Sequence, residues 1–173
     1  SFFKENKSLL LFISLMLVFR SAVADWNDVP TGSMKPTIVE GDRILINKMA
    51  YDIRLPFSQL SMVKLDDPQP NDIVIFESKA ADKRLVKRVI GIPGDTVALL
   101  NNTLIINGKP AKYKTFSQQN GITISQETIG NSTHFVSTKT EPGQISYSRL
   151  ANFAPVNIPE GFYLMMGDNR DNS

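Results

Sequence analysis

Short apolar runs separated by turn residues are the feature that most constrains how this 173-residue chain folds. The runs are rich in Ile, Leu and Val, and turn pairs such as Pro93-Gly94, Asn101-Asn102 and Asn107-Gly108, continuing into Lys109-Pro110, separate them. Pairs of this kind mark turns, and two such residues between alternating runs predict a β-hairpin. The pattern therefore predicts a mostly β fold, with strands at 42–48, 72–77, 84–92, 96–100, 103–106 and 162–166.

Two stretches do not follow this pattern. Residues 111–160 are rich in Ser, Thr, Gln and Asn, and we expect loops and edge strands peripheral to any site. Residues 9–19 form an apolar run behind Lys4 and Lys7. This is typical of a secretory signal peptide cleaved after Ala22-Val23-Ala24 and also of a membrane helix. A span needs about 20 residues, which 8–26 supplies if Arg20 reaches the interface and Trp26 anchors there.

A serine and a lysine are the residues that suggest chemistry. Ser33 lies on a Gly-containing turn at 30–37, and a hydroxyl nucleophile needs an adjacent base. The chain has no Cys, and its one histidine, His134, lies in a polar stretch expected to be a loop or edge strand, where it suits a Ser-His-Asp triad poorly. Lysine is then the remaining base, and Ser-Lys variants of the triad exist.

Lys87 is the lysine best suited to act as a base. In a strand, Leu85, Lys87 and Val89 share one face, so apolar neighbours would desolvate the amine and lower its pKa. The alternative is an edge-strand lysine that prevents sheet-to-sheet aggregation, and strand spacing alone does not separate the two interpretations.

Other ligand classes receive little support. The net charge of +2 comes without a basic patch carrying interleaved aromatics, so we expect no nucleic-acid partner. Residues 167–172 resemble a calcium loop, but Arg170 stands where a ligand is needed and no glycine follows at the required spacing. We therefore expect no metal, and no organic cofactor is required for a Ser-Lys mechanism.

Four ordered blocks carry a resemblance to a known family. They are Gly32-Ser33-Met34 with Pro36-Thr37, the run 41–48 that follows, the segment 87–95, and the block 167–173 at the end of the chain. In this order they resemble the bacterial type I signal peptidases, the leader peptidase family of membrane-bound serine proteases.

The resemblance implies a role for each matching residue. Ser33 is the nucleophile, and Lys87 is the general base that later protonates the leaving amine. The Ser33 N–H and the Thr31 hydroxyl form the oxyanion hole; the family often has serine where this chain has threonine. Ser173 matches the serine that holds the lysine amine in place. Two charged residues of the same block match a structural ion-pair region: Asp168 and Arg170.

The resemblance also implies an architecture and a location. An N-terminal transmembrane helix, with residues 1–26 as the membrane anchor, precedes a coiled, partly barrel-like antiparallel β-sheet catalytic domain at 27–173. Arg20-Ser21 stand where the family has Arg-Ser at the end of a membrane helix. Lys4 and Lys7, which precede the apolar run, predict a cytoplasmic N-terminus by the positive-inside rule. The catalytic domain then lies outside the bacterial plasma membrane, and we expect the family's fold to continue beyond Ser173.

The family's substrates are secretory preproteins, cut after a small-x-small pattern. Residues that flank the nucleophile and the base would leave room for Ala and little more. We expect this pocket wall to comprise Val29, Pro30, Met34, Ile38, Leu85 and Val86, although ordinary core packing is an equal alternative for Ile38.

Three other interpretations stay open at the level of sequence. One is a specialised peptidase that matures a pilus or conjugation protein. Another is a self-cleaving repressor protease of the LexA type, which shares the Ser-Lys dyad but should carry a DNA-binding helical region and an Ala-Gly bond, both missing from this sequence. The last is an inactive, anchored β domain.

Overall fold

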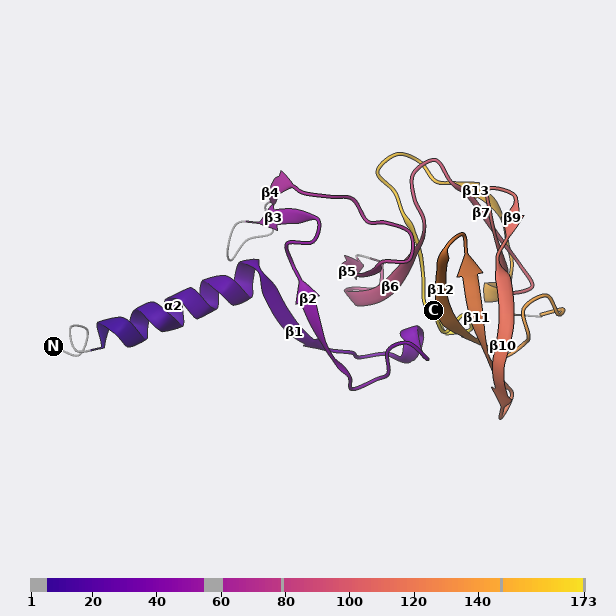
Figure 1. The fold of residues 1–173 in the computed structure, drawn as a ribbon, viewed down its shortest axis with the longest axis horizontal. Coiled ribbons are helices and arrows are strands. Elements are labelled where there is room, and N and C mark those ends of the chain that lie inside the picture. Colours follow the sequence, from indigo (N-terminus) through magenta and orange to yellow (C-terminus); the bar gives the residue numbers. More distant parts are fainter. Residues whose placement is uncertain (1–5, 55–60, 79, 147, 173) are drawn as a thin grey trace. The chain divides into compact units, whose positions relative to one another are not determined.

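The computed structural model describes residues 6–54, 61–78, 80–146 and 148–172 (Figure 1). The described chain is mostly β with antiparallel sheets and a short N-terminal helix, so the predicted fold class is confirmed at this level. It divides into two compact units, one formed by residues 1–28 and 43–67 and the other by 29–42 and 68–173.

The first unit begins with α2 (Lys7–Ala22) and continues into β1 (Ala24–Asp28), which pairs antiparallel with β2 (Arg43–Asn47). A second pair, β3 (Asp52–Arg54) and β4 (Ser61–Lys64), completes it. The Lys48 amine donates to the carbonyl oxygens of Arg20 and Ser21 at 3.0 and 3.3 Å, which caps the end of the helix.

The predicted membrane-spanning helix is not found: within the described ranges, no helix is long and apolar enough to cross a membrane. The 16 residues of α2 rise about 24 Å, whereas the hydrocarbon core measures roughly 30 Å. The prediction was too long because it counted residues up to Trp26 as helical. The structure instead places Trp26 in β1, opposite Leu45 of β2.

In its described residues, the second unit contains three sheets. The first has the strand order β14-β6-β5, and the second has the order β13-β7-β8-β9. The third is a meander, β10-β11-β12, whose neighbouring strands run antiparallel (Figure 1). The bounds of these strands are β5 Ile73–Ser78, β6 Lys83–Gly91, β7 Thr96–Leu100, β8 Thr103–Ile106, β9 Lys109–Pro110, β10 Lys112–Gln119, β11 Ile122–Ile129, β12 Ser132–Thr138, β13 Phe153–Asn157 and β14 Leu164–Met166.

Turn chemistry accounts for the tight hairpins. Asn101 and Asn102 have φ of 48° and 59° and connect β7 to β8 directly, as predicted. Asn and Gly adopt this left-handed region at low cost, which is why such pairs close two-residue hairpins. Asn107-Gly108 repeats the arrangement and connects β8 to β9. The prediction that the turn continues through Lys109-Pro110 was wrong, because these residues form β9.

The buried core joins β6, β7 and β8 to the loop after β13. Ile90, Val97, Leu99, Leu104 and Ile158 pack together there, and each is less than a tenth exposed. Ile90 anchors the C-terminal half of β6 in this cluster, and the same strand carries Lys87.

Residues 111–160 were predicted as peripheral loops and edge strands; the edge strands are confirmed for β10, β12 and β13, but the prediction is wrong for β11, which lies between β10 and β12. They contain β10, β11, β12 and β13, together with the short 3-10 helix η2 (Arg149–Ala151). Alternate residues Thr123, Ser125 and Glu127 of β11 are buried, each with 1% exposure or less. The polarity of these residues predicted exposure, although they form a buried face on which Glu127 is held by hydrogen bonds from Tyr113 and Arg170.

Candidate active site

Ser33 is the central residue of the 3-10 helix η1 (Gly32–Met34) and is buried, with 7% of its surface exposed. Thr31 precedes this helix in extended conformation, and its Oγ1 lies 3.4 Å from Ser33 Oγ. The first N–H groups of a helix have no acceptor within the helix. The Ser33 N–H therefore has no acceptor within η1, and it belongs to the same turn as the Thr31 hydroxyl.

Lys87 lies on β6, and β6 contacts η1. Burial lowers the pKa of the Lys87 amine, and the nearby charge of Lys83 lowers it further. Within the described part of the chain, no carboxylate lies within ion-pair distance of this amine to oppose the effect. β6 is the middle strand of its sheet, but β14 pairs only with the part of β6 from Arg88 to Gly91, so at Lys87 the strand pairs with β5 alone. The edge-strand alternative therefore stays open at this position.

The next residue along β6, Arg88, forms a buried ion pair. Its Nε and Nη2 donate to the two oxygens of Asp168 at 2.9 and 2.7 Å, and the side chains are 5% and 1% exposed. Thr37, four residues beyond the nucleophile, also donates its hydroxyl to Asp168. Through Asp168, the block 167–172 therefore binds both β6, which carries Lys87, and the segment that follows η1.

Arg170 forms a second buried pair, with Glu127 of β11. Tyr113 of β10 donates its hydroxyl to the same carboxylate, and His134 Nε2 lies 3.0 Å from it. Burial alone would raise the pKa of Glu127, but the Arg170 charge, together with hydrogen bonds from His134 and Arg170, lowers it to about 2. Burial and the Glu127 charge raise the pKa of Tyr113.

His134 lies in β12, an edge strand of its sheet, as the sequence predicted. It is nevertheless buried, with 8% exposure, because its imidazole packs against the Glu127 carboxylate. The side chain is thus committed to this cluster, which leaves Lys87 as the base considered for Ser33.

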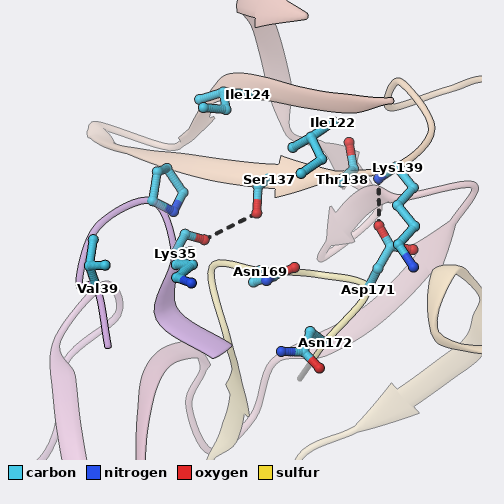
Figure 2. A pocket seen from close by; sticks show the side chains of 11 residues that line it. Lys35, Val39, Ile122, Ile124, Ser137, Thr138, Lys139, Asn169, Asp171 and Asn172 are labelled. Carbon is cyan, nitrogen blue, oxygen red and sulfur yellow. Dashed lines mark hydrogen bonds between the residues drawn. The ribbon is translucent and has the colours of Figure 1, made fainter. Parts of the chain in front are cut away.

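A groove of about 530 Å³ lies beside the nucleophile turn and is bounded by β11, β12 and the block 167–172 (Figure 2). The Ser137 hydroxyl donates to the carbonyl of Lys35 across it, and the Lys139 N–H donates to Asp171. Its lining residues are Lys35, Pro36, Val39, Ile122, Ile124, Ser137, Thr138, Lys139, Asn169, Asp171 and Asn172.

None of the six residues predicted to form the substrate pocket lines this groove. Of those six, Val29, Met34 and Val86 are buried, Ile38 and Leu85 are half-buried, and Pro30 is exposed. Their role in binding a substrate stays a prediction. So does that of Ser173, which lies outside the described residues.

The sequence interpretation placed Asp168 and Arg170 in an ion-pair region, as the structure shows, but missed the partners of these two residues. Arg88 adjoins Lys87 in the same block, and its charge inside an apolar run was a signal that it needed a buried partner. Glu127 and Tyr113 gave no comparable signal, because they lie in a polar stretch. The remaining missed contacts come from two residues of the recognised blocks, Thr37 and Asn169.

The structure thus places a buried serine on a turn that contacts the strand of a lysine whose pKa is lowered, and Ser-Lys variants of the serine-protease triad use these two residue types. The chain belongs to the signal peptidase family, peptidase S26, whose family model matches residues 3–173. The predicted family is therefore confirmed.

Relatives from several bacteria agree with this membership. Signal peptidase I of Pseudomonas aeruginosa is 37% identical over 97% of this chain and 60% of its own length. Signal peptidase I of Rickettsia typhi is 34% identical over 98% of this chain and 70% of its own. Signal peptidase I of Buchnera aphidicola is 27% identical over 99% of this chain and 68% of its own length. The chain thus spans 60% of the length of the Pseudomonas relative.

Proposed function

We propose that this chain carries the catalytic centre of a serine endopeptidase that removes leader peptides from exported preproteins. The observation that carries the proposal is the position of Lys87, a desolvated amine of lowered pKa on the strand that contacts the turn of Ser33. A lysine is a base only when it is neutral, and desolvation favours that form. Family membership supports the reaction class.

In the proposed mechanism, Ser33 Oγ attacks the scissile carbonyl while neutral Lys87 accepts the hydroxyl proton. The Ser33 N–H and the Thr31 hydroxyl donate to the oxyanion, and removing one such donor typically costs about 2.7–4 kcal/mol of transition-state stabilisation. Lys87 then protonates the leaving amine, which leaves an acyl-enzyme on Ser33. Water activated by Lys87 attacks the ester and regenerates the hydroxyl. Ser173 would orient the lysine amine.

The proposed substrates are secretory preproteins with small residues at the scissile position and two residues upstream. An extended peptide turns alternate side chains toward the enzyme, so two positions are restricted together. The apolar side chains beside Ser33 and Lys87 would form the shallow walls of these subsites: Val29, Pro30, Met34, Ile38, Leu85 and Val86.

The proposed location is the bacterial plasma membrane, with the catalytic unit on its outer side. The support is α2, whose leucines and phenylalanines from Leu9 to Phe19 are largely exposed around the helix. A helix that is apolar on all sides needs an apolar environment. Association with lipid vesicles, measured by flotation with and without residues 1–22, tests this part of the proposal.

Cleavage of a preprotein by the full-length enzyme in detergent tests the catalytic assignment. We expect Ser33→Ala and Lys87→Ala each to abolish cleavage, and the double variant to be no worse, because the two residues act as one unit. Lys109→Ala, which removes an exposed lysine of β9, is the matched control and should cleave normally. Near-normal processing by Lys87→Ala would disprove the dyad.

A further inference from the structure

The geometry points to Asn169 as a positioning residue for the oxyanion hole, an inference that rests on the proposed function. Asn169 makes two hydrogen bonds to the nucleophile turn. Its side-chain Nδ2 donates to the Gly32 carbonyl at 3.2 Å, and its main-chain N–H donates to the Ser33 carbonyl at 2.9 Å. These carbonyls belong to the peptide units on either side of the Ser33 Cα.

Holding both peptide units fixes the backbone of Ser33. A peptide unit is planar, and the Gly32 carbonyl and the Ser33 N–H belong to the same one, so they point in opposite directions. A donor on the Gly32 carbonyl therefore sets the direction of the Ser33 N–H. It also polarises that N–H, because hydrogen bonds in a chain strengthen one another.

The support for Asn169 is itself rigid. Its neighbours in sequence, Asp168 and Arg170, are each held by a buried ion pair. On the other side, Ser137 of β12 accepts from the Arg170 N–H, and its own N–H donates to the Asp168 carbonyl, at 3.0 and 2.9 Å. In Figure 2, the loop that carries Asn169 lies in space beside Ser137 of β12 and beside Lys35. The two ion pairs thereby act on the site through Asn169.

The expected loss of kcat depends on which hydrogen bonds to the nucleophile turn remain after the Asn169 side chain is removed. The Gly32 carbonyl also accepts the Lys35 N–H at 3.2 Å, and substitution by Ala or Leu keeps the main-chain N–H of residue 169 that donates to the Ser33 carbonyl. Removing an oxyanion donor outright lowers kcat about 10²–10³-fold, so misaligning one that is still present should lower it about 10- to 100-fold. KM should change little, because the oxyanion forms only in the transition state.

The experiment compares Asn169→Ala and Asn169→Leu, the second keeping the side-chain volume without a donor, with Asn131→Ala as control. Asn131 is exposed in the turn between β11 and β12 and does not line the groove. With the full-length enzyme, both Asn169 variants should lose kcat and affinity for a peptide boronate that mimics the tetrahedral intermediate, at constant KM and melting temperature. The control should match wild type.

Three results would overturn the inference. One is kcat within about threefold of wild type in both Asn169 variants. Another is a loss that appears equally in KM and melting temperature, since that indicates a general structural defect. In either case Ser33→Ala remains inactive, and the proposed function stands. The third is activity in Ser33→Ala, which would remove the proposed function and this inference together.

Discussion

Replacing Glu127 by Gln should destabilise the protein strongly, because it leaves the Arg170 guanidinium buried without its counter-charge. The two side chains are 0% and 1% exposed, so solvent screens neither. The pKa of the carboxyl falls from 4.5 to about 2 on folding, and that difference corresponds to about 3 kcal/mol. The same figure is typical of breaking a buried ion pair. For a protein of this size it lowers the melting temperature by about 6–12 °C.

The sign of the pH dependence makes the prediction specific. A carboxyl whose pKa is lowered on folding stabilises the protein above its unfolded pKa, and this contribution is lost as the pH falls through the folded value. Thermal unfolding should therefore show a large difference between wild type and Glu127→Gln at pH 7, which shrinks as the pH falls from 4.5 toward 2.

The matched control is Glu77→Gln, which breaks the exposed pair of Glu77 with Arg84. Exposed pairs contribute about 0–1 kcal/mol, so this variant should unfold close to wild type at every pH. The buried pair would not stabilise the fold as argued if Glu127→Gln lowered the melting temperature as little as this control does. The same conclusion would follow if Glu127→Gln lowered the melting temperature equally in acid and at pH 7.

Three further predictions concern the site. Lys83→Gln removes a charge that lowers the pKa of Lys87, so the rise of kcat/KM with pH should move to more alkaline pH; an unmoved profile would speak against Lys87 as the base. Asp168→Asn leaves Arg88 uncompensated and releases Thr37, and should cost about 3–5 kcal/mol in a denaturation experiment, with a loss under 1 kcal/mol as the contrary result. Peptides varied at the scissile position should be cut after Ala, Gly or Ser but not after Phe or Lys, because overfilling a packed site costs about 1–3 kcal/mol, and efficient cleavage after Phe would refute a small pocket.

Local chemistry explains which parts of the fold were predictable. The hairpins around Asn101-Asn102 and Asn107-Gly108 follow from residues that adopt positive φ at low cost, and the β7 and β8 bounds were predicted without error. The N-terminal helix was predicted too long, because residues 23–26 were counted as helical, whereas the pairing of β1 with β2 from Ala24 and the Lys48 amine on the last carbonyls end the helix. Such pairing is a long-range property that composition does not report.

The site divides in the same way. Ser33, Lys87 and Thr31 were recognisable because their blocks are short and local. The contacts that brace them join residues far apart in the sequence, such as Arg88 with Asp168 and Arg170 with Glu127. Glu127 lies in a stretch whose polarity predicts exposure, and only the folded sheet reveals its burial. Sequence patterns thus identified the candidate reacting groups and one member of each buried ion pair, Asp168 and Arg170, but not the partners Arg88 and Glu127.

The identity of the acylated side chain decides whether Ser33 and Lys87 form the catalytic pair. The full-length enzyme is mixed with an activated ester of a peptide ending in Ala-x-Ala, quenched in acid, digested and analysed by mass spectrometry. We expect the acyl group on Ser33, none in Ser33→Ala, and strongly reduced acylation in Lys87→Ala at neutral pH. An acyl group on another side chain, or acylation of Ser33 that is unaffected by loss of Lys87, would contradict the proposed mechanism.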